Sequence, residues 1–183
     1  VAPDDETVRY CQRQFGADAM HAAPDAVVVL YDSYAATYDA HLIGGLQYRT
    51  PLLVADAIRQ RFTQLRLDLL DLGCGNGLIA EYISDHSGAH VTGLDYIAHA
   101  IGQAQSRTAV KAGRLTFEIG DINRLALPDR AFDCIVSIDT IYFSTDYTAT
   151  IRALLAALRP GGRLAFLYSH GREPWVPVSS FAR

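Results

Sequence analysis

The chain has 183 residues, of which 50% are hydrophobic and 20% are charged, and its formal net charge is -4 at pH 7. This length and composition suit one globular α/β domain with its own core. The weak negative charge gives no electrostatic reason to expect nucleic acid as the main partner, and the longest apolar runs are too short for a membrane span. The three cysteines, Cys11, Cys74 and Cys134, are not spaced for zinc, so we expect no metal site and a reducing, cytoplasmic location.

The N-terminal residues 1–48 are predicted to form an arm and a lid helix. Residues 1–24 are polar and mixed, which is typical of a weakly ordered arm. In the helical pattern that follows, Tyr31, Tyr34 and Tyr38 recur on one face. These tyrosines either pack on the domain or form a lid whose phenols face a ligand, and the periodicity alone favours packing.

Residues 49–183 are predicted to form the main domain. A helix opens after a Gly-Gly break, with Thr50 as its cap and Pro51 in its first turn. Five apolar segments bounded by turn signals are then predicted as strands, at residues 67–72, 90–95, 115–119, 132–138 and 163–168. Helical patterns separate these segments, at residues 78–86, 98–112 and 146–158. Strands that alternate with helices predict an α/β fold with a doubly wound, mostly parallel sheet in three layers, α/β/α.

The segment 69–77 joins a predicted buried strand to a glycine-dense turn and a helix start. Glycines let the backbone come close to a ligand, and a helix N-terminus offers free N–H groups. In an open α/β sheet, ligands bind at the carboxyl ends of the strands. The candidate residues are therefore those just past each strand: Gly73 to Gly77, Asp95 and Tyr96, Asp121 and Ile122, Ser137 to Tyr142, and Ser169 and His170.

A glycine loop with an acid at the end of the second strand fits two kinds of cofactor. Dinucleotide enzymes use G-x-G-x-x-G to receive a pyrophosphate. Here Gly73, Gly75 and Gly77 give G-x-G-x-G, with Leu78 where the third dinucleotide glycine would fall. Asp71, just before the loop, would repel a pyrophosphate and attract a cation. S-adenosylmethionine carries a sulfonium and an ammonium group and no phosphate, so the local chemistry favours it.

At these residues the sequence resembles the class I S-adenosylmethionine-dependent methyltransferases, and the resemblance covers roughly residues 31–170. Its first segment, residues 31–39, is similar to the opening helix of many small-molecule methyltransferases of the ubiquinone-biosynthesis type. In those enzymes a tyrosine covers the methionine end of the cofactor, which favours the lid interpretation for Tyr34 and Tyr38. Five further segments carry the resemblance in family order: residues 69–77, Asp95, 120–122, 132–140 and 158–162.

The resemblance and the local chemistry together imply roles for the site residues. Asp71, with the backbone around Gly73, would hold the ammonium group of the cofactor, and Asp95 would take both ribose hydroxyls. Asp95 and Asp121 could instead be a helix cap and a turn residue, and Asp133 is interpreted as structural. The other residues expected at the cofactor are Cys74 (not as a nucleophile), Gly75 and Gly77 in the loop, Tyr96, Ile97 and Ile122 against the adenine, Asp121 at its amino group, and Ser137 and Asp139 beneath the methionine portion.

The resemblance implies methyl transfer to a small organic acceptor. In-line displacement from a sulfonium mainly requires that the acceptor be held close, aligned and dry. Tyr142 and Phe143 are expected to shape the acceptor pocket. A general base is needed only if the acceptor must lose a proton. His170 and His41 are the candidates for it, although a lone histidine is more often a surface or structural residue.

Only residues 171–183 follow the fifth predicted strand, where the family's sheet usually continues. We therefore expect the chain to be part of a longer polypeptide, with the sheet truncated after the fifth strand. If it is complete, either Trp175 and its neighbours or a partner subunit, such as a second copy in a homodimer, must cover that apolar edge. Two alternatives remain: a protein that binds S-adenosylmethionine in a non-methylating or regulatory role and, less favoured, an NAD enzyme.

Overall fold

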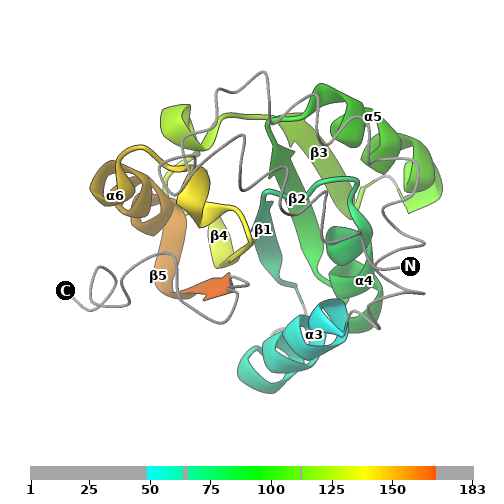
Figure 1. The fold of residues 1–183 in the computed structure, drawn as a ribbon. Coiled ribbons are helices and arrows are strands. Elements are labelled where there is room, and N and C mark those ends of the chain that lie inside the picture. Colours follow the sequence, from blue (N-terminus) through cyan, green and yellow to red (C-terminus); the bar gives the residue numbers. More distant parts are fainter. Residues whose placement is uncertain (1–48, 64–65, 112, 168–183) are drawn as a thin grey trace.

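The computed structural model describes residues 49–63, 66–111 and 113–167, and these residues form an α/β sheet structure (Figure 1). Five parallel strands lie in the order β3-β2-β1-β4-β5. The chain therefore reverses its direction of winding between β1 and β4, and an open α/β sheet binds ligands at such a point. The strands are β1 (Asp68–Leu72), β2 (His90–Asp95), β3 (Leu115–Ile119), β4 (Phe132–Ile138) and β5 (Leu158–Leu167).

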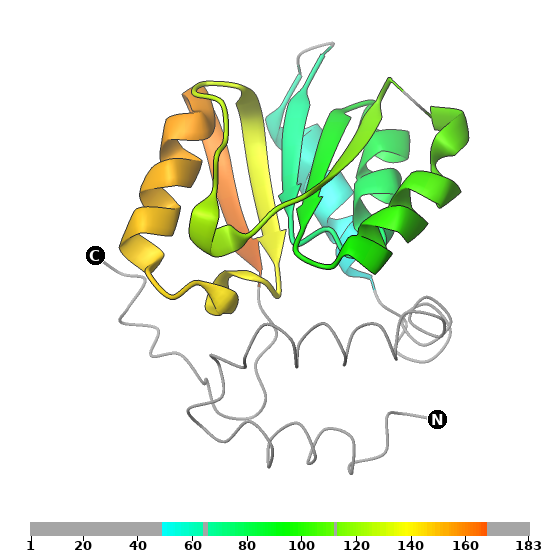
Figure 2. The same cartoon turned by 90° about the horizontal axis from the view of Figure 1, so that it is seen from above.

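Helices cover both faces of the sheet, which confirms the doubly wound, three-layer arrangement (Figure 2). Neighbouring residues of the central strand, Leu69 and Leu70, are both fully buried and belong to separate apolar clusters. The first cluster includes side chains from α3 (Thr50–Arg61), α4 (Leu78–Ser87) and α5 (Ala98–Arg107), and the second includes side chains from α6 (Tyr147–Ala157). Three short 3-10 helices complete the described elements: η3 (Ala109–Lys111), η4 (Ile122–Arg124) and η5 (Ile141–Phe143).

Three details differ from the sequence-based expectations. Arg49, not Thr50, is the N-cap residue of α3, and no side chain caps this helix, although a proline does lie in its first turn. The helix expected at 98–112 ends at Arg107 and gives way to η3. β5 already begins at Leu158 because a register irregularity against β4 accommodates the Pro-Gly-Gly segment inside the strand.

Charged side chains connect β1, β4 and β5 near the amino ends of these strands. Asp133 Oδ2 accepts hydrogen bonds from the Asp68 N–H, at 2.9 Å, and from Arg159, at 2.6 Å. Arg159 also donates to the Asp68 carboxylate at 2.8 Å. These contacts confirm that Asp133 is structural, and they lie at the end of the strands opposite to the one where ligands bind. No helix in the described part of the chain has the length and apolar character needed to cross a bilayer.

Candidate functional site

The loop between β1 and α4 is a tight turn that depends on positive φ angles. Gly73, Gly75 and Gly77 have φ values of 82°, 53° and 80°, which side chains make costly. The Gly73 N–H donates to the Leu94 carbonyl of β2 at 2.7 Å. A Cβ at Gly73 would lie 1.8 Å from Thr140 Oγ1, in the segment that follows β4. Glycine at this position therefore lets the segments that follow β1 and β4 meet.

Gly77 serves packing and does not line the cleft described below. A Cβ at this position would lie 2.9 Å from the Ala104 Cβ of α5 and 2.9 Å from the Phe117 ring of β3. That Gly77 passes close to the cofactor stays a prediction. In the structure, this glycine allows the first turn of α4 to lie against α5 and β3.

Replacing Gly77 by alanine should lower the free energy of unfolding by about 2–3 kcal/mol, because the new methyl group is crowded in addition to the unfavourable φ. Gly88 is the matched control: its φ is 73°, but a Cβ there would meet no atom within 4 Å. Gly88→Ala should therefore cost only about 1 kcal/mol, the strain alone. Urea denaturation measures both variants, and equal losses would contradict the packing role of Gly77.

Asp95 at the end of β2 organises the backbone on two sides. Its Oδ2 accepts a hydrogen bond from the Gly75 N–H and its Oδ1 accepts one from the Ile97 N–H, each at 2.8 Å. Burial raises the pKa of this carboxyl, and the backbone N–H groups partly offset the increase. One carboxylate thus joins the glycine loop to the start of α5.

A cleft of about 220 Å³ opens at the carboxyl ends of the strands, beside the glycine loop. Nine residues expected at the site line it: Gly73, Gly75, Asp95, Tyr96, Ile97, Asp121, Ile122, Asp139 and Phe143. Asn76 and Thr140 also line it and fall within the candidate ranges 73–77 and 137–142, whereas Ala100 and Gln103 on α5 and Asn123 in η4 were not expected from the sequence. The lining therefore comes from the segments that follow β1, β2, β3 and β4.

Asp71 and Ser137 lie near the carboxyl ends of the two central strands, β1 and β4, but do not line the cleft. Both are buried, and Asp71 Oδ2 and Ser137 Oγ have no hydrogen-bond partner among the residues that the structure describes. Burial, with a smaller contribution from the nearby Asp95 charge, raises the pKa of Asp71 to about 7. Unpaired buried polar atoms are costly and rare in native proteins. This pair is therefore the strongest indication in the site that a polar ligand completes it.

Cys74 in the same loop is buried, and burial raises the pKa of its thiol. A thiol that stays protonated is a poor nucleophile, which supports the expectation that Cys74 has no nucleophilic role. Four further candidates, Tyr34, Tyr38, His41 and His170, lie outside the described residues. The backbone of Tyr142 belongs to η5, but its side chain is outside the described part of the structure.

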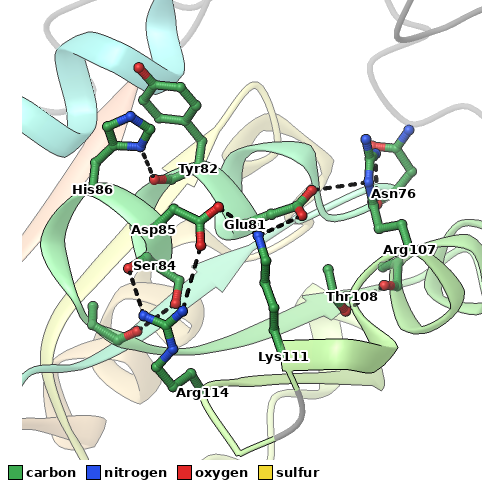
Figure 3. Close-up of polar contacts among 12 residues, drawn as sticks. Asn76, Glu81, Tyr82, Ser84, Asp85, His86, Arg107, Thr108, Lys111 and Arg114 are labelled. Atoms are coloured by element: carbon green, nitrogen blue, oxygen red, sulfur yellow. Dashed lines mark hydrogen bonds and ion pairs between the residues drawn. The ribbon is translucent and has the colours of Figure 1, made fainter.

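Ion pairs and a hydrogen bond connect the glycine loop and α4 to α5 and η3 (Figure 3). Arg107 on α5 donates to the Asn76 carbonyl at 3.4 Å and pairs with Glu81 of α4 at 3.3 Å. Lys111 lies between Glu81 and Asp85, with N···O distances of 2.9 and 2.5 Å. These contacts join α4 to α5 and η3 and so fix the position of the helix that begins at the loop.

Comparison with known proteins identifies the family. A model described as "Methyltransferase domain" matches residues 69–162, which is just over half of the chain and includes the loop and all the residues that line the cleft. The chain belongs to this methyltransferase family. The chain is also 31% identical, over 130 residues, to a ubiquinone biosynthesis O-methyltransferase of Xanthomonas oryzae, covering 68% of this chain and 54% of that protein. It spans about half the length of this relative and less of several others.

Solved structures agree on the fold. Phosphoethanolamine N-methyltransferase 2 of Haemonchus contortus, in complex with S-adenosyl-L-methionine, is 26% identical with a TM-score of 0.55, covering 62% of this chain and 27% of that one. The [4+2]-cyclase SpnF is 27% identical with a TM-score of 0.60, covering 70% of this chain and 48% of that one. The family cofactor is S-adenosylmethionine. The residues present fit it, because Asp71, whose Oδ2 has no partner among the described residues, immediately precedes the glycine loop, and the cleft beside this loop is lined by the carboxylates of Asp95 and Asp121.

Proposed function

We propose that this chain is an S-adenosylmethionine-dependent methyltransferase domain that acts on a small organic acceptor by in-line methyl transfer. The observation that carries the proposal is the buried Asp71 carboxyl with its unpaired Oδ2, immediately before the G-x-G-x-G loop. A buried carboxylate is stable only beside a cation or several donors. The ammonium group of S-adenosylmethionine offers both, whereas the pyrophosphate of a dinucleotide would be repelled.

The cleft supports roles for the other carboxylates. The Asp95 carboxylate already accepts backbone N–H groups, including those of Gly75 and Ile97; a carboxylate has about four lone-pair sites, and it is proposed to accept from the ribose hydroxyls as well. Asp121 lines the cleft, and its Oδ1 caps η4 by accepting the Asn123 N–H at 2.8 Å; its carboxylate is proposed to accept from the adenine amino group as well. Ile97 and Ile122 are buried and supply an apolar wall for the adenine ring. Ser137, with its unpaired hydroxyl, and Asp139 are proposed beneath the methionine portion.

The cofactor supplies a methyl group on a positively charged sulfur, which is a good leaving group. The chain then has to bind and orient the acceptor and exclude water. Phe143, which lines the cleft from η5, is proposed to contact the acceptor. Three further roles remain predictions: a second acceptor contact from Tyr142, a lid formed by Tyr34 and Tyr38, and a general base at His41 or His170. So do the domain boundary between residues 48 and 49, a homodimer and a cytoplasmic location.

The cheapest test is thermal unfolding with S-adenosylmethionine, S-adenosylhomocysteine and NAD as alternative ligands. A ligand at a hundred times its dissociation constant stabilises the folded state by about 2.7 kcal/mol, which raises the melting temperature of a chain of this size by about 5–10 °C. We expect this increase with the first two ligands and none with NAD. An increase with NAD alone would overturn the proposal.

Methyl transfer itself is tested with radiolabelled S-adenosylmethionine and a panel of small phenols, amines, acids and quinols. Label should appear in at least one class of acceptor. Tight cofactor binding without transfer to any of them would favour the alternative, a cofactor-binding protein with a non-methylating or regulatory role. One solved structure similar to this chain, SpnF, is described as a [4+2]-cyclase and not as a methyltransferase, so this alternative is worth testing.

A further inference from the structure

Two short 3-10 helices, η4 and η5, contribute residues to the lining of the cleft. η4 follows β3, at one edge of the sheet, and carries the lining residues Ile122 and Asn123. η5 follows β4 and carries the lining residue Phe143. In the sheet, β3 and β4 are separated by β2 and β1. A contact between η4 and η5 therefore joins segments that lead from strands that are not neighbours.

The side chain of Asn123 makes this contact with both ends of its amide. Its Nδ2 donates to the Phe143 carbonyl at 3.1 Å. Its Oδ1 accepts from the Thr145 N–H at 2.7 Å and from Thr145 Oγ1 at 2.9 Å. A primary amide is needed, because the contact uses a donor and an acceptor together.

In addition to the exposed contact made by Asn123, a buried contact links η4 to the residue that follows η5. Ser144 Oγ and Thr150 Oγ1 are 2.8 Å apart, and Thr150 Oγ1 lies 3.4 Å from the Ile122 carbonyl. Both residues are buried, at 1% and 5% exposure. The backbone of η4 is also fixed locally, because Asp121 Oδ1 accepts the Asn123 N–H. η4 is therefore linked to the end of η5 through Asn123 at the surface, and to Ser144, just after η5, through the buried Thr150 of α6.

We propose that Asn123 is a positioning residue that couples the adenine side of the cleft to η5, the segment on the acceptor side. The inference rests on the proposed function, which places adenine against Asp121 and Ile122. When adenine contacts these residues, η4 is restrained, and the Asn123 amide transfers the restraint to the backbone of η5. The acceptor side of the cleft is then ordered by the cofactor before the acceptor arrives, which lowers the cost of binding the acceptor.

Residue-resolved amide hydrogen exchange, with adenosine as the probe, tests the coupling without any acceptor. The informative amides are those of Phe143 and Ser144, which donate to the Thr140 and Ile141 carbonyls and not to Asn123 itself. Adenosine should slow exchange at both by about tenfold in the natural protein and by about threefold or less in Asn123→Ala, in which only the buried Thr150 contact remains. A purely structural role would change exchange without ligand and leave this ligand-induced ratio intact.

Three further variants sharpen the result. Asn123→Asp keeps an acceptor for Thr145 but loses the donor to Phe143, so it should also lose the ligand-induced protection, and it replaces Asn123→Ala if that variant misfolds. Thr145→Val removes only the hydroxyl contact and should keep most of the protection. Arg124→Ala, at an exposed neighbouring position in η4, should keep all of it.

Gly75 provides an internal reference, because its N–H donates to Asp95 and not to η4. If adenosine protects Gly75, Phe143 and Ser144 equally well in Asn123→Ala and in the natural protein, the coupling is refuted and the proposed function stands. If adenosine protects Gly75 but not Phe143 and Ser144 in the natural protein, the coupling is likewise refuted and the proposed function stands. If neither adenosine nor S-adenosylhomocysteine binds, the proposed function fails and the coupling fails with it.

Discussion

Asp95→Ala should weaken the binding of S-adenosylhomocysteine by about 2–4 kcal/mol, roughly 30- to 1,000-fold in affinity. The substitution removes the proposed acceptor of both ribose hydroxyls. It also releases the N–H groups of Gly75 and Ile97, which the carboxylate holds in place at 2.8 Å. Isothermal titration calorimetry at fixed pH measures the change directly.

Two controls separate these contributions. Asp95→Asn keeps one oxygen acceptor and nearly the same shape, so it should lose less affinity than Asp95→Ala. Asp129→Ala removes an exposed carboxylate from the loop before β4 and should leave the affinity unchanged. An affinity of Asp95→Ala within about threefold of the natural protein would refute the ribose role, since even one lost charge-assisted hydrogen bond costs more than that.

The strands were the part of the fold most easily predicted from the sequence. The expected bounds of β2, β3 and β4 agree with the structure, because each strand is a short apolar run ended by a polar or glycine residue. β5 was the exception. Arg159-Pro160-Gly161-Gly162 has the composition of a turn, yet pairing with β4 extends the strand back to Leu158. Pairing of this kind depends on the neighbouring strand and leaves no local signal.

Site residues that follow directly from a strand end could likewise be placed from the sequence. Gly75, Asp95 and Asp121 line the cleft because the carboxyl ends of parallel strands meet at one edge. Gln103 and Asn123 were missed, since each reaches the cleft from a helical segment whose distance from the site is set by tertiary packing. Ala100 and Gln103 follow Ile97 at intervals of three, so a helix-face pattern starting from Ile97 could have found them.

Gly77 and Asp71 belong to the same sequence motif but have different surroundings in the structure. Both belong to the segment that resembles the family's first motif, but Gly77 packs against Phe117 and Ala104, and Asp71 lies buried behind the loop. The spacing of residues indicates that a loop is present. Only the three-dimensional surroundings show which member faces the ligand, which one packs and which one holds an unpaired charge.

The Asp71 carboxyl should make the stability of the free protein depend on pH. Its pKa is about 7 in the folded protein and is near 3.8 in the unfolded chain. Between these values the folded state holds a proton that the unfolded state has lost, so the free energy of unfolding falls as pH rises from about 4 to about 7 and then levels off. The full difference corresponds to about 4 kcal/mol as an upper bound.

Asp71→Asn should therefore stabilise the free protein at pH 8, by about 1–3 kcal/mol, because it removes a buried charge. The same substitution should weaken S-adenosylmethionine binding about a hundredfold or more, since the ammonium group loses its counter-charge. In the natural protein the affinity should rise with pH up to about 7, with a proton released on binding; in Asp71→Asn this dependence should be gone.

Ser137→Ala is the matched comparison for Asp71→Asn. It removes the other unpaired buried polar atom, Ser137 Oγ, without removing a charge, so it should leave the pH dependence of binding intact. Urea denaturation and calorimetry across pH 5–9 measure stability and affinity on the same samples. If Asp71→Asn lowers stability and affinity together at pH 8, Asp71 is a structural residue and the ammonium site lies elsewhere. If Asp71 serves to bind a cationic ligand, Asp71→Asn should raise stability and lower affinity, because burying the carboxylate is costly until that ligand binds.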